Sequence, residues 1–309
     1  MTKINNQFLQ RNCPCCSSSS YKKNIIDSPK KAENLNLDKL KKSWFGFFKE
    51  KIIFSYRRCS NCDLLYCPIF FSNIQLKKLY EEMPANMDEV PLASLKKTQY
   101  GYFKHLKAYS KLSGEMLEIG PDIGLFTENC VSEGSFSKFW LFEPNKMVKE
   151  TLERLVQGIP SQVEHDMFNF NGIPDKSLST VVMIHVMDHL LDPIQTLKKI
   201  KNKLKENSQI LVVTHDESSF LRKIFGWRWP AFCLQHPQIY NKLTTKNLFE
   251  SAGFEIVTQK KTVNYFKVSF LFKHLLWALG FKVKDVPSFF NLNVGLKLGN
   301  ILTIAKIKK

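Results

Sequence analysis

Four cysteines in two closely spaced pairs are the clearest candidates for chemistry in this chain. Two residues separate Cys13 from Cys16, and two separate Cys59 from Cys62. This gap lets both thiolates of a pair reach one tetrahedral zinc ion, and two such pairs complete a closed structural site. The alternatives are disulfides and a redox pair. Residues 1–7 are polar and unlike a signal peptide, so we expect a cytoplasmic protein with reduced thiols.

A second candidate is the segment Met116–Gly124, where an apolar run leads into a loop that contains Gly120 and Gly124. Glycine lacks a Cβ atom, so its backbone can turn tightly and approach a ligand closely. Nineteen residues after Gly124, another apolar run ends in Glu143, whose carboxylate can accept hydrogen bonds from both hydroxyls of a ribose. This order of elements is typical of a βαβ unit that holds an adenosine group.

The loop spacing excludes the dinucleotide fingerprint G-x-G-x-x-G, because the place three beyond Asp122 is Leu125. The spacing Glu118-x-Gly120-x-Asp122-x-Gly124 instead resembles the first motif of class I S-adenosylmethionine (SAM) methyltransferases, with Asp122 in place of the middle glycine. The resemblance implies that this loop binds the methionine end of SAM and that Glu118 reaches its ammonium group.

Further motifs of the same superfamily follow in the expected order. Asp166 stands where these enzymes place an acidic residue on the adenine amino group. Residues 180–184 have the composition of a buried parallel strand and lead into His185–Pro193, which resembles the H-V-L-E-H-L-x-D-P signature of the branch with sugar and small-molecule methyltransferases. Ser179 replaces the family's usual aspartate. The resemblance covers most of residues 114–260.

The elements that must position these residues belong to an α/β fold. We expect a Rossmann-like SAM methyltransferase sheet, mostly parallel with an antiparallel last strand, in residues 114–309. Within it lie a substrate-loop insertion at 215–243 and a sheet-completing segment at 255–309. A small zinc ribbon at 1–80 and a helical linker at 81–113 precede the sheet. A ribbon ahead of a SAM domain resembles the arrangement in sugar C-methyltransferases and polysaccharide-pathway methyltransferases.

Three side chains are candidates for the methyl-transfer chemistry. Ligands of open α/β sheets lie beyond the carboxyl ends of the strands, and His185 ends the fourth strand, beside the SAM methyl group. Histidine titrates near neutral pH and can deprotonate an acceptor, although His185 can equally serve packing alone. Residues 227–240 resemble the acceptor region of the ribbon-bearing enzymes, with the family's histidine displaced to His236. Tyr240 offers a phenol as the alternative.

Composition bounds the partners of the chain. Its 309 residues carry a formal net charge of +17, and 44% of them are hydrophobic, which excludes a disordered chain. Lysines spread along helix faces, and arginine is scarce, which argues against nucleic-acid recognition and favours an anionic or sugar-linked small molecule. No uncharged run spans a membrane. Residues 264–282 predict a helix that caps the core, contacts a membrane surface peripherally or forms a dimer contact, and the oligomeric state is not predicted.

We therefore expect a cytoplasmic enzyme, with possible peripheral membrane contact, that uses SAM and carries one structural zinc ion. Its expected acceptor is a sugar or nucleotide-sugar of surface-polysaccharide biosynthesis. One alternative is an RNA or protein methyltransferase that uses the basic surface. Another is a SAM-fold module without catalytic activity, which the residues Asp122 and Ser179 leave open.

Overall fold

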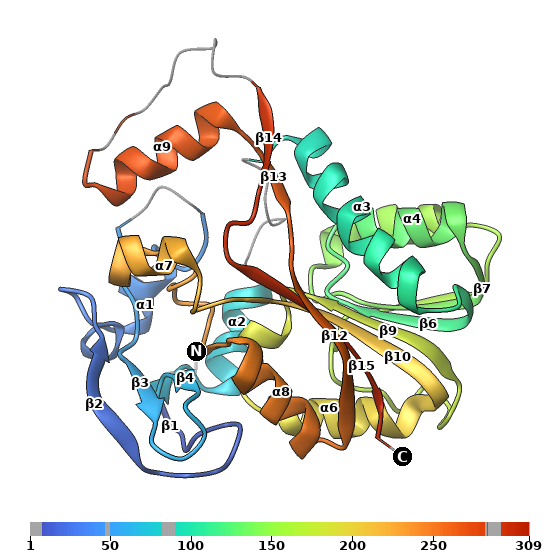
Figure 1. The fold of residues 1–309 in the computed structure, drawn as a ribbon, viewed down its shortest axis with the longest axis horizontal. Coiled ribbons are helices and arrows are strands. Elements are labelled where there is room, and N and C mark those ends of the chain that lie inside the picture. The colour runs from blue at the N-terminus through green and yellow to red at the C-terminus, as the bar shows by residue number, and fades with distance from the viewer. Residues whose placement is uncertain (1–7, 47–49, 82–89, 282, 284–291, 309) are drawn as a thin grey trace.

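In the computed structural model of the protein, the described residues are 8–46, 50–81, 90–281, 283 and 292–308 (Figure 1). The polar first residues, part of the expected linker, and parts of the expected helix at 264–282 and of the C-terminal segment lie outside the described residues. The chain folds into a large α/β body and a smaller cysteine-bearing body beside one edge of its sheet.

Among the described residues, the main sheet has seven strands in the order β12-β15-β10-β9-β6-β7-β8. Neighbouring strands from β10 to β8 are parallel, whereas β15 is antiparallel to both β10 and β12. This order confirms the expected fold class, a mostly parallel sheet with an antiparallel last strand. The strands are β6 (Ser113–Ile119), β7 (Ser135–Phe142), β8 (Ser161–Glu164), β9 (Leu178–Ile184), β10 (Leu204–His215), β12 (Phe254–Lys261) and β15 (Asn300–Ile307).

Helices cover both faces of this sheet because a buried strand sends alternate side chains to opposite sides. In β9, Val181 and Met183 pack with α6 and α8, whereas Val182 and Ile184 pack with α3, α4 and α5. Figure 1 shows α3 and α4 on one face and α6 and α8 on the other. The helices are α3 (Leu92–Tyr109), α4 (Leu125–Glu133), α5 (Lys149–Leu155), α6 (Pro193–Lys203) and α8 (Lys242–Ser251).

The cysteine-bearing body is built around a second sheet with the order β11-β4-β3-β2. Its strand β11 comes from the segment between β10 and α8, so two parts of the chain far apart in sequence share one sheet. This pairing joins the N-terminal body to the expected substrate-loop insertion. Its elements are β1 (Leu9–Gln10), β2 (Tyr21–Ile26), α1 (Leu37–Lys41), β3 (Tyr56–Cys59), β4 (Leu65–Tyr66), β5 (Ile69–Phe70), α2 (Asn73–Glu81) and β11 (Gln238–Ile239).

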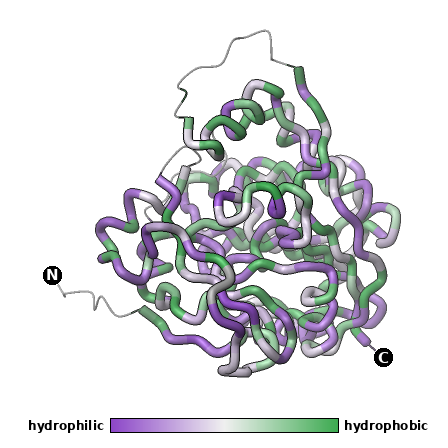
Figure 2. Tube along the Cα trace, turned by 60° about the vertical axis from the view of Figure 1, so that its left-hand side comes forward, coloured by the Kyte–Doolittle hydropathy of each residue, from purple (hydrophilic) through white to green (hydrophobic). Residues whose placement is uncertain are grey.

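A hairpin, β13 paired with β14, projects from the main body and carries α9, whose apolar residues appear green in Figure 2. The hairpin is tied to α3, since Tyr265 N–H donates to Thr98 Oγ1 at 2.8 Å. No helix in the described part of the chain is long and apolar enough to cross a membrane. The remaining elements are α7 (Phe220–Phe225), β13 (Asn264–Lys267), α9 (Val268–Ala278), β14 (Asn293–Leu296) and the 3-10 helices η1 (Ala32–Asn34), η2 (Lys146–Val148), η3 (Met187–His189) and η4 (Gly226–Arg228).

Candidate functional site

The loop after β6 depends on its two glycines. Gly120 has φ +71°, and a Cβ atom there would lie 2.6 Å from Val186 Cγ2. Gly124 has φ +79° at the start of α4, and a Cβ atom there would lie 2.6 Å from Leu155 Cδ2. Both positions combine left-handed backbone with a close neighbour, so only glycine fits without strain. The loop therefore turns sharply at the carboxyl end of the strand, as the sequence predicts.

Asp122 takes the place of the middle glycine and keeps the shape of the loop. Its φ of +52° lies in the left-handed region, which aspartate adopts more readily than most residues. Its N–H donates to Glu143 Oε2 at 2.8 Å, so the loop is tied to the end of β7. The departure from the glycine motif thus changes the side chain but preserves the backbone conformation.

Glu143 lies at the tip of β7 beside this loop, and its side chain is held there by backbone amides. The residue is 7% exposed and accepts N–H groups from Asp122 at 2.8 Å and from Asn145 at 2.9 Å. Burial raises the pKa of this carboxyl, while those two amides act in the opposite direction. The structure therefore places the carboxylate predicted to bind a ribose directly against the predicted cofactor loop.

The other two acidic residues expected at the cofactor lie in different surroundings. Glu118 is 2% exposed and accepts a hydrogen bond from the Thr127 hydroxyl of α4. Burial, with the charge of Glu143 as a smaller contribution, raises the pKa of Glu118 to about 7 despite that hydrogen bond. Asp166 follows β8, is exposed, and accepts the Phe168 N–H at 3.3 Å. Glu118 and Glu143 thus lie on either side of the loop after β6, and Asp166 lies just beyond the end of β8.

A line of histidines occupies the carboxyl ends of β9 and β10. The ring centroid of His185 is 4.7 Å from that of His215, which is 4.7 Å from that of His236. A fourth ring, that of His189, lies another 4.7 Å from His236. The side chains of His185 and His215 are 30% and 22% exposed. The structure thus brings together the predicted residues His185 and His236 and adds His215 between them.

The buried residue that organises this line is Asp188. It has no exposed surface, and its Oδ2 accepts the backbone N–H of His215 at 3.1 Å and lies 3.0 Å from its ring Nδ1. Its Oδ2 is also 3.9 Å from His185 Nδ1. Burial opposes ionisation of Asp188, but the facing rings of His215 and His185 hold its pKa below the ordinary value.

Sequence reasoning did not single out His215 or Asp188 as site residues. A signal for each was present: Asp188 stands at the acidic position of the signature that begins at His185, and His215 is the last residue of the fifth parallel strand. Strand ends of a parallel sheet meet at one edge, so a polar residue at each end deserves inclusion among candidates.

His236 and Tyr240 are both buried, with different consequences. His236 Nδ1 lies 2.6 Å from Ala231 O and 3.4 Å from Cys233 Sγ. Burial opposes protonation of His236, but the Cys233 thiolate outweighs it and raises the His236 pKa to about 9. Tyr240 is fully buried, and its hydroxyl donates to Met187 O at 3.3 Å. The Tyr240 hydroxyl is therefore already hydrogen-bonded to a backbone carbonyl beside the histidines.

The four predicted metal ligands converge in the N-terminal body. The Sγ atoms of these cysteines all lie within 4.8 Å of one another, and the closest pairs are Cys13 with Cys62 at 3.4 Å and Cys16 with Cys59 at 3.5 Å. The N–H of Asn61 points to Cys59 Sγ at 3.4 Å, which supports a thiolate at that position. These separations fit four sulfurs about 2.3 Å from one tetrahedral zinc ion.

Contacts between the two bodies cover the segment after β9. Arg11 donates to Leu191 O at 2.9 Å, and the Gln238 amide donates to Leu190 O at 2.7 Å. Arg58 forms a two-point ion pair with Glu217, at 2.8 and 2.7 Å. Both bodies are therefore needed to complete the surroundings of the histidines.

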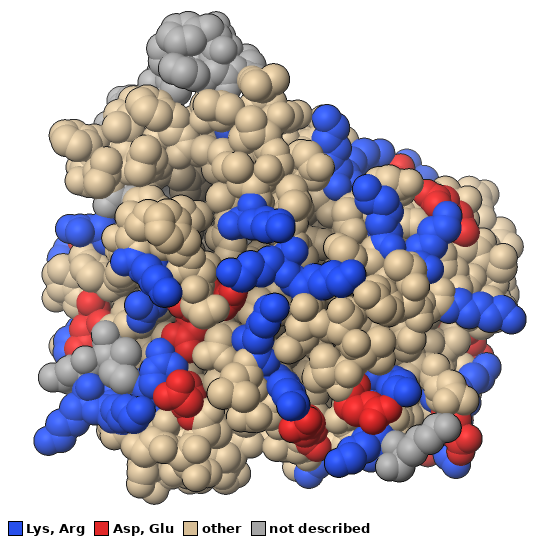
Figure 3. Space-filling model, in the orientation of Figure 1, with Lys and Arg blue, Asp and Glu red and all other residues tan. Residues whose placement is uncertain are grey.

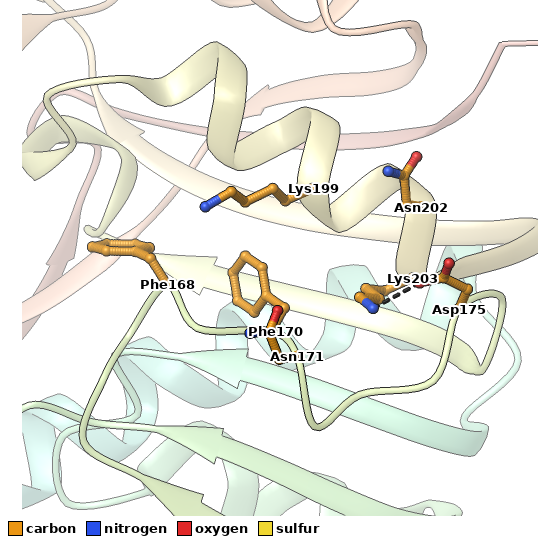
Figure 4. A pocket seen from close by; sticks show the side chains of 7 residues that line it. All are labelled: Phe168, Phe170, Asn171, Asp175, Lys199, Asn202 and Lys203. Atoms are coloured by element: carbon orange, nitrogen blue, oxygen red, sulfur yellow. Dashed lines mark hydrogen bonds and ion pairs between the residues drawn. The ribbon is translucent and has the colours of Figure 1, made fainter.

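A hollow at another place on the surface is unrelated to this line. Figure 4 shows it between the segment after β8 and α6, and there Lys203 Nζ binds Asp175 at 2.6 Å. It shares no residue with the histidines. It is lined by Phe168, Phe170, Asn171, Asp175, Lys199, Asn202 and Lys203.

Comparison with known proteins connects this geometry to a family. A family model described as a methyltransferase domain matches residues 95–259. A chain of the complex between a Haloferax volcanii methyltransferase and the Trm112 methyltransferase activator aligns with a TM-score of 0.51 at 12% identity, over 70% of this chain and 92% of that chain. A SAM-dependent methyltransferase from Leishmania major aligns with a TM-score of 0.48 at 14% identity, over 75% and 81% of the two chains. No match was found among curated proteins.

Proposed function

The chain belongs to the methyltransferase-domain family, and from that premise we propose that it methylates a hydroxyl-bearing small molecule, a sugar or nucleotide-sugar. The family match and the fold make it a SAM-dependent methyltransferase. The acceptor class is the proposed part, and it rests on the surroundings of the histidines at the carboxyl edge of the sheet.

The limited exposure of the histidine side chains is the observation on which this proposal rests. His185 and His215 keep 30% and 22% of their side chains exposed, at the ends of the two strands nearest the expected methyl group. The ring centroids of His236 and Trp229 lie 4.7 Å and 6.1 Å from that of His215, so aromatic rings stand on the sides of His215. A small molecule can reach side chains with this limited exposure, whereas the surface of a folded polymer requires a wider approach.

The polar side chains around the two histidines favour a polyhydroxylated acceptor. His185 and His215 offer ring nitrogens, and Asn300 adds an amide 3.4 Å from His185 Nε2. Polar side chains at a partly closed site need hydrogen-bonding partners, and the hydroxyls of a sugar provide them.

The charge distribution gives less support to an RNA acceptor. On the face shown in Figure 3, Lys and Arg side chains are spread among neutral and acidic ones instead of forming one continuous track. Recognition of a nucleic-acid backbone relies on clustered cations along the path of the phosphates. The net charge of +17 remains suited to an anionic acceptor such as a nucleotide-sugar.

We assign cofactor binding to the loop residues Gly120, Asp122 and Gly124 with Glu118 and Glu143, and to Asp166 at the adenine. Bound SAM would supply an electrophilic methyl group; as an acceptor hydroxyl oxygen attacks it in line, S-adenosylhomocysteine leaves and the hydroxyl proton passes to the His185 ring, the proposed base. The protein contributes alignment of the two partners, which lowers the barrier by several kcal/mol. His185 and His215 stand where the acceptor hydroxyl would lie and can hold it by hydrogen bonds.

Zinc at the four cysteines is part of the same proposal. One structural zinc ion would be held by the Sγ atoms of the two cysteine pairs and would tie the start of the chain to the turn after β3. The two turns that carry the cysteines would gain folding free energy from such an ion. This role is structural and supplies no chemistry to methyl transfer.

A contact with a membrane surface stays a prediction. No described residue of α9 is buried, and Leu275 and Leu279 are 41% and 60% exposed, on and just after this helix. Such exposure is equally suited to a partner protein or a second copy of the chain. Cytoplasmic location and a role in surface-polysaccharide synthesis also remain predictions.

The test begins with titration calorimetry of SAM and S-adenosylhomocysteine and continues with a turnover screen that measures S-adenosylhomocysteine release. We expect SAM binding and release only with nucleotide-sugars or free sugars, with transfer RNA and basic peptides as the comparison acceptors. Release with RNA or peptide, and not with sugars, would overturn the acceptor class. No SAM binding at millimolar concentration would identify a module without catalytic activity.

A further inference from the structure

We propose that His185, Asp188 and His215 bind one divalent transition-metal ion at the carboxyl ends of β9 and β10. The binding site stands on these three side chains alone, whereas the role of the ion toward the acceptor rests on the proposed function. This site is separate from the four cysteines, which lie in the N-terminal body.

Three ligand atoms of suitable chemistry converge at this point. One ligand atom from each residue lies within 4.8 Å of the other two. Asp188 Oδ2 stands between the rings, 3.0 Å from His215 Nδ1 and 3.9 Å from His185 Nδ1. Two cis ligands of an ion at about 2.0–2.2 Å are separated by roughly 3 Å, so small side-chain adjustments bring all three atoms to one ion.

Unpaired polar atoms give an independent indication of a missing ligand. Within the described part of the chain, His185 Nδ1 and Asp188 Oδ1 are buried and have no hydrogen-bond partner. Asp188 has no exposed surface at all. Buried polar atoms are nearly always paired, so these two require a partner that the protein itself does not supply. A bound cation would satisfy the ring nitrogen and compensate the buried carboxylate.

The backbone at His185 supports the same assignment. Its φ of +54° is left-handed, a conformation that histidine adopts at a cost, and such strain is concentrated at functional sites.

The donor set determines which ions fit. Two imidazoles and one carboxylate suit zinc, iron(II), cobalt(II) or nickel(II), whereas magnesium and calcium prefer oxygen ligands alone. Three protein ligands leave coordination positions open toward the partly exposed side of His185 and His215. Two adjacent oxygens of an acceptor can occupy them together, so the substrate class narrows to vicinal diols and hydroxycarbonyl sugars.

Metal binding at His215 requires its ring proton to move. Without metal, the ring proton on Nδ1 faces Asp188 Oδ2 at 3.0 Å. When the ion bonds to Nδ1 and to the carboxylate, Nε2 carries the proton instead, so the imidazole remains neutral and no net proton is released.

The competing explanation is a metal-free pair in which Asp188 only orients His215. In the experiment, the full-length protein is loaded with cobalt(II) or zinc(II), and unbound metal ion is then removed. We expect about two metal ions per chain in the wild type, one at the cysteines and one at the new site. Cobalt should show the intense bands of a four-thiolate site together with weaker bands of a nitrogen and oxygen site.

Two variants and one control locate the second ion. His215→Ala and Asp188→Asn should each retain the four-thiolate bands and lose about 100-fold or more in affinity for the second ion. His274→Ala removes a histidine on α9 and should keep both ions. Retained SAM affinity in His215→Ala shows that the main sheet is intact, and His185→Ala provides a further ligand variant if Asp188→Asn fails to fold.

A wild-type protein that binds only the four-thiolate ion at millimolar cobalt and zinc would overturn the proposal. So would a second ion that persists in both His185→Ala and His215→Ala. Neither result affects the proposed function. SAM binding and S-adenosylhomocysteine release are measured in separate experiments, in buffer that a chelator has freed of metal ions.

Discussion

The two halves of the site differ in how far apart along the chain their residues lie. Most of the proposed nucleoside half, from Glu118 to Glu143, comes from one βαβ unit, in which the Asp122 N–H donates to the Glu143 carboxylate. The acceptor half joins β9, β10, the segment before α8 and the N-terminal body. Its main residues and the contacts that enclose them are His185, Asp188, His215, His236, Arg11, Arg58 and Gln238.

This difference implies unequal dependence on the rest of the molecule. The nucleoside half needs only the local backbone and the core under β6 and β7. The acceptor half needs the N-terminal body to be folded and seated on Leu190 and Leu191. Perturbing the N-terminal body should therefore affect the acceptor half and spare cofactor binding.

The largest expected effect comes from Cys59→Ser, which removes one of the four proposed zinc ligands. Because structural zinc contributes about 10 kcal/mol or more to small domains, we expect a loss of at least about 5 kcal/mol from the N-terminal body. Hydrogen exchange should show unprotected amides there, while SAM affinity by calorimetry changes less than about threefold. Loss of SAM binding would show that the nucleoside half also depends on the N-terminal body, contrary to the difference described above.

Cys67→Ala is the matched control for the zinc variant. Cys67 is fully buried and its sulfur faces Phe54 O at 3.9 Å, outside the four-cysteine cluster. We expect unchanged metal content and a loss of about 1 kcal/mol from the lost packing. A change in metal content would make Cys67 a ligand and contradict the assignment of the four.

Arg58→Met tests the ion pair that joins the two bodies. The Arg58 and Glu217 side chains are 18% and 5% exposed, so the variant leaves a buried carboxylate without its cation. We expect a loss of about 3 kcal/mol in the free energy of unfolding, measured by urea titration, with SAM affinity retained. Glu217→Gln together with Arg58→Met should recover part of this loss, since no charge then remains buried.

Gly120→Ala examines the nucleoside half directly. The new Cβ atom would lie 2.6 Å from Val186 Cγ2 on a left-handed backbone, so we expect a loss of about 2 kcal/mol and at least about tenfold weaker SAM binding. Asp122→Gly is the contrast, because glycine suits the existing φ of +52°. Equal SAM affinity in Gly120→Ala and wild type would contradict the close approach of this loop to the cofactor.

Glu118→Gln has an expected effect that depends on pH. The folded-state pKa of Glu118, about 7, is above the ordinary value of 4.5, so its contribution to stability is present below pH 4.5 and is lost as pH rises through 7. At pH 8 the variant should be about 3 kcal/mol more stable than wild type, and near pH 5 only about 1 kcal/mol more stable. Thermal melts at both values, without SAM, provide the measurement. Equal stability at pH 8 would show that Glu118 is solvated.

The nucleoside half was predictable because its geometry is local. A backbone position that needs positive φ next to a neighbouring side chain requires glycine, and this requirement is visible in the sequence at Gly120 and Gly124. Asp122 departs from the family pattern, and the structure shows why the loop survives: the residue keeps the left-handed backbone. The mostly parallel sheet with an antiparallel last strand likewise followed from motifs that appear in register along the chain, whereas the strand order came from the structure.

The acceptor half was only partly predictable because its partners are distant in sequence. His185 and His236 were candidates by their positions. The place of His215 at the end of β10 makes it a strand-end candidate, but no sequence pattern shows that its ring lies between those of His185 and His236. The role of Asp188 depends on η3 packing against the end of β10, where its carboxylate meets the His215 backbone. A hydrogen bond between residues 27 apart has no local sequence pattern.

The sequence by itself determined the backbone of the cofactor loop and the four sulfurs that can share one ion, because short spacings limit which atoms can meet. Only the tertiary structure decided that β11 would join the N-terminal sheet and that Asp188 would be buried between two histidines. The physical reason is that burial of a carboxylate, and of the segment over it, is stabilised by contacts from several distant elements at once.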